Sequence, residues 1–280
     1  TGQGFAVVAD GMGGHAAGDV ASQIVVTEMF GELKLLFQTQ TDLEQNIRNV
    51  LREATKEVNS CIALYSQHNP ETNFMGATLL APLLFSERLY WVSVGDSPLF
   101  LFRNGELTRL NEDHSMAPQI DLMYRQKLID IEQAKNHPDR NCLTSVLVGR
   151  EIAKMDCTGK PVRLRQDDIV VAASDGLQFL SDRRIAEILK MYQNRPSIEI
   201  SAALLRDIEE LDDPMQDNVS LCVIKPIGLE AVQEHVPCQV SPKIVGQTAE
   251  GLQEPSSVTV LLRKKRGGTN TYCYSKKVRP

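Results

Sequence analysis

Hydrophobic and polar positions alternate along this chain with periods that change from block to block. The run Gly4–Ala9 is short, apolar and rich in valine, which predicts a strand buried on both faces. From about Ala16 to Phe37, and again from Leu43 to Ile62, apolar residues recur every three to four positions, as in amphipathic helices. Thr41-Asp42 provides a candidate N-cap for the second helix. The chain is therefore expected to begin with one strand and two long helices.

The pattern changes to strands after Asn69-Pro70. Between residues 76 and 110 stand the runs "GATLLAPLLF", "RLYWVSVGD", "PLFLFR" and "ELTRL", separated by short polar turns such as Asn104-Gly105. Connections this short join antiparallel neighbours. Residues 116–136 are expected to be helical or irregular.

The remaining pattern adds a second set of strands and helices. An apolar strand ends at Asp175-Gly176, two amphipathic segments cover about Asp182–Met191 and Ile198–Glu210, and "DNVSLCVIK" predicts a last strand. Clustered strands beside clustered helices favour an α+β fold over a doubly wound parallel sheet. We therefore expect antiparallel sheets with helices packed outside them.

Composition divides the chain at about residue 225. Residues 226–280 mix Pro, Gly, Ser and basic side chains, with eight Lys and Arg against four Glu, and contain one strand-like piece, "SVTVLLR". We interpret residues 1–225 as one domain and 226–280 as a basic, largely disordered linker or tail. The net charge of the whole chain is −6, so the domain alone carries about −10. An acidic domain is a poor partner for nucleic acid.

The cysteines and the hydropathy of the sequence indicate the compartment of the protein. The six cysteines are scattered, without a CxxC pair, which favours a reducing, cytoplasmic compartment over a disulfide framework; Cys142 and Cys157 are expected in the core. No apolar run approaches the roughly 20 residues that span a bilayer, so no membrane span is expected.

Four aspartates share one context, the end of a predicted strand. These are Asp10, Asp96, Asp175 and Asp217, and the first three are next to a glycine. A lone Asp-Gly is more often a turn than a ligand. Carboxylates that met at one sheet end would instead suit the hard ions Mg²⁺ or Mn²⁺. The residues alone leave both interpretations open.

Longer blocks of sequence carry a family resemblance. The stretches "FAVVADGMGGHAAGDVAS", "GATLLAPLLFSERLYWVSVGDSPLFLFRNGELTRLNEDHS", "HPDRNCLTSVLVG", "DDIVVAASDGLQFLSDRRI" and "QDNVSLCVIK" resemble, in order, the motifs of bacterial metal-dependent protein phosphatases of the 2C type. The resemblance runs from about Gly4 to Lys225. It implies a β-sandwich of two antiparallel sheets flanked by helices, with two or three Mg²⁺ or Mn²⁺ ions at one end.

The resemblance also implies roles for single residues. Asp10 would bridge two metal ions, the Gly11 carbonyl would help to bind one of them, and Asp175 and Asp217 would ligate the other. Asp96, together with Asp175, would hold a weaker third ion. Asp10 and Asp175 are thus the expected catalytic residues, acting through a metal-activated water that attacks phosphorus.

The implied function is a serine/threonine phosphoprotein phosphatase, with a Ser/Thr kinase as the expected partner in signalling. The sequence departs from the family pattern in two places. The family usually has an earlier strand that supplies a phosphate-binding arginine and another acidic ligand, and this chain is expected to lack it. Pro98 stands where the family has an arginine. A catalytically impaired phosphatase-like regulatory or binding module is therefore the alternative.

Overall fold

The computed structural model describes residues 3–13, 15–39, 43–72, 74–214, 216–226, 257–262 and 272–277. The helices are α1 (His15–Thr39), α2 (Ile47–His68), α3 (Ala117–Arg125), α4 (Ile131–Lys135), α5 (Asp182–Met191) and α6 (Ser197–Glu210), with 3-10 turns η1 (Leu43–Asn46), η2 (Pro70–Thr72) and η3 (Asp175–Phe179). The strands are β1 (Gln3–Phe5), β2 (Gly11–Met12), β3 (Gly76–Ala77), β4 (Leu79–Phe85), β5 (Arg88–Val94), β6 (Leu99–Arg103), β7 (Glu106–Arg109), β8 (Asp156–Cys157), β9 (Val162–Arg163), β10 (Ile169–Ala173), β11 (Ser220–Ile224), β12 (Ser257–Leu262) and β13 (Tyr272–Lys277).

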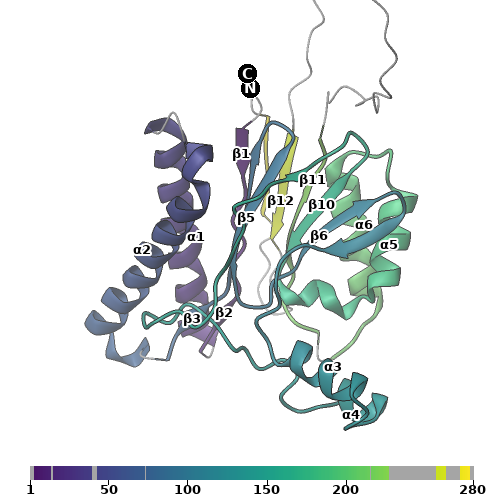
Figure 1. Ribbon diagram of the computed structural model, residues 1–280, viewed down its shortest axis with the longest axis horizontal. Helices are drawn as coiled ribbons and strands as arrows, with labels where there is room; N and C mark the ends of the chain where they lie inside the picture. Colours follow the sequence, from purple (N-terminus) through teal and green to yellow (C-terminus); the bar gives the residue numbers. More distant parts are fainter. Residues whose placement is uncertain are drawn as a thin grey trace, which may run out of the picture.

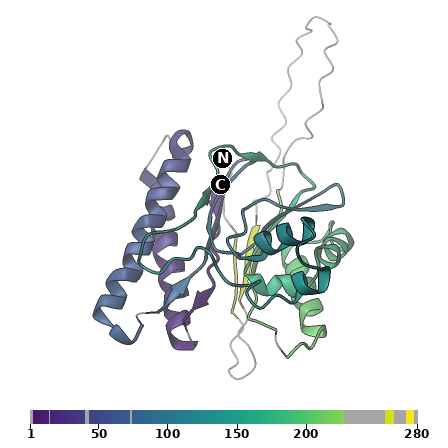
Figure 2. The ribbon, with the colours of Figure 1, turned by 60° about the horizontal axis from the view of Figure 1, so that its bottom comes forward.

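Two antiparallel sheets lie face to face. The first has the order β1-β4-β5-β8, with β9 also paired to β5, and the second has the order β13-β12-β11-β10-β6-β7. In Figures 1 and 2, α1 and α2 cover the first sheet, and α5 and α6 cover the second from the opposite side. The helices α3 and α4 lie at one end of this sandwich (Figure 1).

Three apolar layers hold the sandwich together. One lies between α1, α2 and the first sheet, a second lies between the second sheet and α5 and α6, and the third lies between the sheets. The third layer includes Leu80 and Trp91 from the first sheet and Leu99 and Val170 from the second. Alternate residues of each strand therefore face different layers, which is why the strands read as nearly continuous apolar runs.

The first strand is shorter than the pattern predicted, and Pro82 explains the difference. β1 ends at Phe5, although the chain stays extended beside β4 as far as the bridge between Val8 and Leu80. The N–H of Ala6 donates to the Pro82 carbonyl at 3.1 Å, but proline has no N–H to return the bond. The ladder is interrupted at this one pair, and the segment still leads to Asp10.

The predicted helices are present with small shifts at their ends. α1 begins one residue before the predicted start, and α5 spans the predicted residues. α2 begins at Ile47, after a turn of 3-10 helix, with Asn46 at its N-cap position. The proposed cap at Thr41-Asp42 lies outside the described residues.

The division at residue 225 stays a prediction. Within 226–280 the structure describes Pro226 and the strands β12 and β13, of which β12 pairs with β11 and covers most of "SVTVLLR". The interpretation of the rest as disordered lies outside the described residues. Of the two cysteines expected in the core, Cys157 is buried but Cys142 is exposed, so that expectation was wrong for Cys142.

Candidate active site

The four strand-end aspartates converge at one end of the sandwich. Of the other three, Asp175 has the largest effect on the pKa of Asp10, and the charges of Asp217 and Asp96 also raise it. Burial, followed by repulsion from Asp175, raises the pKa of Asp10 well above its usual range. Burial raises the pKa of Asp175 as well. The structure therefore brings together carboxylates that are far apart in sequence.

Asp10 is positioned by its backbone. Its N–H donates to Thr78 Oγ1 at 2.9 Å, and the Asp10 carbonyl accepts from the Thr78 N–H at 2.8 Å. Thr78 Oγ1 also lies 2.9 Å from Ser97 Oγ, and both hydroxyl side chains are buried. Because Ser97 directly follows Asp96, this pair of hydroxyls connects the loops that carry two of the aspartates.

Asp96 lies in a turn between β5 and β6, and hydrogen bonds from Arg109 and to His114 hold the backbone of this turn. Arg109 donates to the Asp96 carbonyl at 2.7 Å and to Asp113 Oδ2 at 2.9 Å. His114 Nδ1 accepts from the Gly95 N–H at 3.2 Å, which requires a neutral ring, and burial lowers the pKa of this histidine accordingly. Burial and the charges of Asp175 and Asp113 raise the pKa of Asp96 to about 7.

Asp175 follows β10 and Asp217 precedes β11, and these two strands are neighbours in the second sheet. β10 pairs with β11 in the register Ala173↔Leu221, so the chain leaves β10 close to where it enters β11. A Cβ on Gly176 would lie 2.4 Å from the Asn218 carbonyl oxygen, so only glycine permits this approach. Asp217 is exposed, and its Oδ1 accepts from the Asn218 backbone N–H at 2.6 Å.

Gly11 follows Asp10 at a second close approach. It pairs with Ala77 in the short β2–β3 sheet. A Cβ on Gly11 would lie 2.0 Å from the carbonyl oxygen of Gly18, in the first turns of α1. The loop after Asp10 can therefore pack directly on α1 only because both residues lack side chains.

The donor set fits a hard divalent cation. It consists of carboxylate oxygens, which Mg²⁺ and Mn²⁺ prefer. Asp175 Oδ1 is buried and has no hydrogen-bond partner, which is costly without a ligand. In the described residues, no three acidic, His or Cys side chains already stand in a metal-binding arrangement. Asp10 and Asp175 are close enough for each carboxyl group to affect the pKa of the other.

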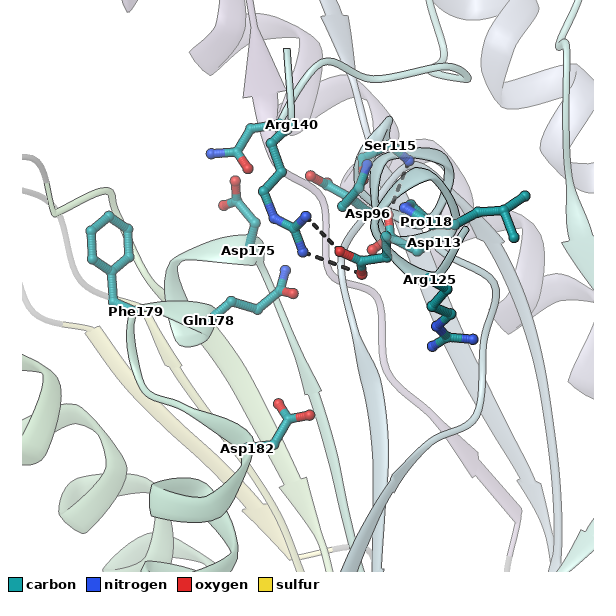
Figure 3. A pocket seen from close by; sticks show the side chains of 14 residues that line it. Asp96, Asp113, Ser115, Pro118, Arg125, Arg140, Asp175, Gln178, Phe179 and Asp182 are labelled. Atoms are coloured by element: carbon teal, nitrogen blue, oxygen red, sulfur yellow. Dashed lines mark hydrogen bonds and ion pairs between the residues drawn. The ribbon is translucent and has the colours of Figure 1, made fainter. Parts of the chain in front are cut away.

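A groove of about 830 Å³ opens beside the aspartates. Asp96 and Asp175 line one end, and the walls come from the α3 region and from η3 and the start of α5 (Figure 3). Arg140 reaches over this end and donates to Asp121 at 2.7 Å. The groove is large enough for a segment of peptide to lie against the carboxylates.

A known protein family matches most of this chain. The model of the family described as protein phosphatase 2C matches residues 1–212. The chain belongs to the protein phosphatase 2C family. Membership confirms the resemblance inferred from the ordered motifs.

Relatives within the protein phosphatase 2C family match most of the chain. The serine/threonine phosphatase Stp of Listeria monocytogenes is 36% identical over 189 residues, which cover 67% of this chain and 72% of that protein. The serine/threonine protein phosphatase PstP of Mycobacterium tuberculosis is 33% identical, covering 77% of this chain and 39% of that protein.

Solved structures of 2C phosphatases confirm the fold. The catalytic domain of PstP in complex with two manganese ions has a TM-score of 0.62 at 32% identity, covering 78% of this chain and 85% of that chain. Stp1 from Staphylococcus aureus has a TM-score of 0.65 at 30% identity, covering 80% and 84%. The predicted α+β sandwich with flanking helices is therefore confirmed.

Sequence reasoning missed the residues that hold the aspartates from behind. Thr78 and Arg109 lie inside the quoted motif blocks, but nothing in the strand pattern marks them as partners of Asp10 and Asp96. His114 lies in the same motif block, and its contact with the Gly95 N–H is not marked by the strand pattern either. Their roles depend on contacts across the fold, which hydrophobic periodicity does not report.

Proposed function

We propose that this chain hydrolyses phosphoserine and phosphothreonine esters of proteins, using Mg²⁺ or Mn²⁺ ions held by the aspartate cluster. The observation that carries the proposal is the convergence of Asp10, Asp96, Asp175 and Asp217 at one end of a 2C-type sandwich. In the proposal, Asp10 and the Gly11 carbonyl would help to hold two ions together with Asp175 and Asp217. Asp96 and Asp175 would hold a third, weaker ion.

The chemistry follows from the charges. Divalent cations at such a site neutralise charge on the phosphoryl oxygens and supply a nucleophilic water at neutral pH. The chain's contribution is to hold Asp10 and Asp175 in place and to give up the protons that their raised pKa values retain. Thr78 fixes the backbone of Asp10, and Arg109 fixes that of Asp96.

Partners and compartment belong to the same proposal. The substrates are proteins phosphorylated on serine or threonine, and a Ser/Thr kinase that phosphorylates them is the proposed counterpart in signalling. The reducing cytoplasm is the proposed compartment, as the scattered cysteines indicate. Among the helices of the described residues, none combines the length and apolar character that crossing a membrane requires.

Release of inorganic phosphate from matched phosphoserine, phosphothreonine and phosphotyrosine peptides tests the function. We expect release from the first two, dependent on added Mn²⁺ or Mg²⁺ and abolished by EDTA. A chain that binds the phosphopeptides in Mn²⁺ but releases no phosphate would instead be the regulatory or binding module. Release that continues in EDTA would overturn the metal-dependent mechanism.

A further inference from the structure

The groove beside the aspartates has two walls of different charge. We call Pro118, Leu122 and Arg125 the α3 wall, and Gln178, Phe179 and Asp182 the α5 wall. In Figure 3, Arg125 and Asp182 lie on opposite sides of the groove, away from Asp96 and Asp175. The groove therefore continues from the aspartate cluster toward a pair of opposite charges.

Two of the acidic side chains that line the groove outside the aspartate cluster already have basic partners within the protein. Asp113 pairs with Arg109 at 2.9 Å, and Asp121 pairs with Arg140 at 2.7 Å. Arg125 and Asp182 also line the groove, and neither forms an ion pair with another residue of the described part of the chain. These two charges are available to a molecule that lies in the groove.

Two large apolar side chains among those that line the groove are exposed. Leu122 on the α3 wall is 52% exposed, and Phe179 on the α5 wall is 36% exposed. An occupant that covered both would remove apolar surface from water. Exposed apolar side chains together with opposite charges suit a peptide segment better than they suit a small phosphate ester.

α3 forms one wall of the groove, so its length sets the distance between the aspartate cluster and Arg125. Asp113 and Ser115, at the start of the α3 region, lie beside Asp96, and Arg125 is the last residue of α3. The eight steps from Ala117 to Arg125 rise about 12 Å along the helix axis. An extended peptide covers this distance in three to four residues, at about 3.3 Å each, and its successive side chains point to opposite sides.

We infer that the groove selects phosphoprotein segments with an acidic residue three or four positions from the phosphorylated residue and a basic residue next to the acidic one. The acidic side chain faces Arg125 and the basic side chain faces Asp182. The inference rests on the proposed function, since it assumes that the phosphorylated residue lies at the aspartate cluster. It makes Arg125 and Asp182 specificity-determining residues for the substrate.

The test is the binding of fluorescein-labelled phosphothreonine peptides, measured by stopped-flow anisotropy in Mn²⁺ so that binding is recorded before hydrolysis. The peptides carry Glu, Ala or Lys in turn at each of the four positions on either side of the phosphothreonine. We expect the wild type to favour Glu over Lys about three- to tenfold at one position three or four residues away, the size expected when attraction at an exposed pair is replaced by repulsion. Lys is expected to be favoured at a neighbouring position.

Charge-altered variants assign the preference to the groove. Arg125→Glu is expected to reverse the ranking at the Glu-selecting position, and Asp182→Asn to abolish the Lys preference while keeping a short side chain at the start of α5. Arg206→Glu is the matched control, because Arg206 is exposed on α6 and lies outside the groove lining. It should keep the wild-type ranking.

Two results would overturn the inference. One is equal affinity of the wild type for Glu and Lys at every position, and the other is a ranking that Arg125→Glu leaves unchanged. Hydrolysis of p-nitrophenyl phosphate in Mn²⁺, measured on the same preparations, separates this failure from failure of the proposed function. Hydrolysis without peptide selectivity would reject the groove assignment alone, whereas selective binding without hydrolysis would reject the phosphatase activity alone.

Discussion

At the scale of single residues, the site is defined by carboxyl groups that repel one another. Burial and mutual repulsion raise the pKa values of Asp10, Asp96 and Asp175. Near neutral pH, a cation that offsets the repulsion favours the state in which these groups are charged together. The repulsion that raises these pKa values in the metal-free protein therefore also favours the binding of divalent cations.

The raised pKa values predict how stability depends on pH. A carboxyl whose pKa is raised on folding stabilises the folded state below its unfolded pKa, near 3.8, and that contribution is lost as pH rises through the folded value, about 7 for Asp96. The metal-free protein should thus lose stability between about pH 4 and pH 8. Since Mn²⁺ restores it by binding the ionised carboxylates, the increase in melting temperature caused by Mn²⁺ should be larger at pH 8 than at pH 5. Equal increases at both pH values would contradict the account.

The buried hydroxyl of Thr78 gives a second prediction at this scale. Thr78→Val keeps the shape of the side chain but removes the acceptor of the Asp10 N–H and the partner of Ser97. We expect a loss of about 1–3 kcal/mol in the free energy of unfolding, together with weaker Mn²⁺ binding. Thr108→Val, at an exposed position in β7, is the control and should change stability by less than about 0.5 kcal/mol. If the two variants were equally stable, the role assigned to Thr78 would be wrong.

At the scale of elements, the site depends on backbone approaches that only glycine allows. η3 lies against the segment before β11 at Gly176, and the loop after Asp10 lies against α1 at Gly11. In each case an added Cβ would meet backbone oxygen, which cannot rotate away as a flexible side chain can. The elements that carry Asp10, Asp175 and Asp217 would therefore have to separate.

Gly176→Ala tests this dependence. The added Cβ would lie 2.4 Å from the Asn218 carbonyl oxygen, so we expect lower stability and weaker Mn²⁺ binding as Asp175 and Asp217 move apart. Gly31→Ala is the matched control, because a Cβ there would meet no atom within 4 Å and α1 should gain about 1 kcal/mol. Denaturant unfolding and Mn²⁺ titration of both variants provide the measurement. Unchanged Mn²⁺ binding in Gly176→Ala would show that the approach is not required.

At the scale of the whole molecule, hydrophobic periodicity predicted most elements, because each strand or helix buries faces that leave a period in the sequence. It placed α5 correctly and found the strands on either side of Asn104-Gly105. It missed the early end of β1, because that depends on Pro82 in a neighbouring strand. Local pattern contains no information about which residue will lie opposite in a sheet.

The same limit applies to the site. The aspartates could be singled out as strand ends, but their convergence depends on the pairing of β10 with β11 and on the packing of two sheets. The motifs resolved that ambiguity only through a family resemblance. Arg109 and Arg125 could not be predicted, since their roles come from contacts or surfaces that form after folding.

The central claim is that the four aspartates form one divalent-cation site, and calorimetric titration with Mn²⁺ at pH 8 tests it most directly. We expect the wild type to bind about two Mn²⁺ ions with measurable affinity, as a two-metal hydrolytic site does. Asp175→Ala should bind at least about a hundredfold more weakly, since it removes a direct ligand and even indirect partners of a ligand contribute about 10- to 100-fold. The same Mn²⁺ affinity and stoichiometry in the wild type and in Asp175→Ala would contradict the account.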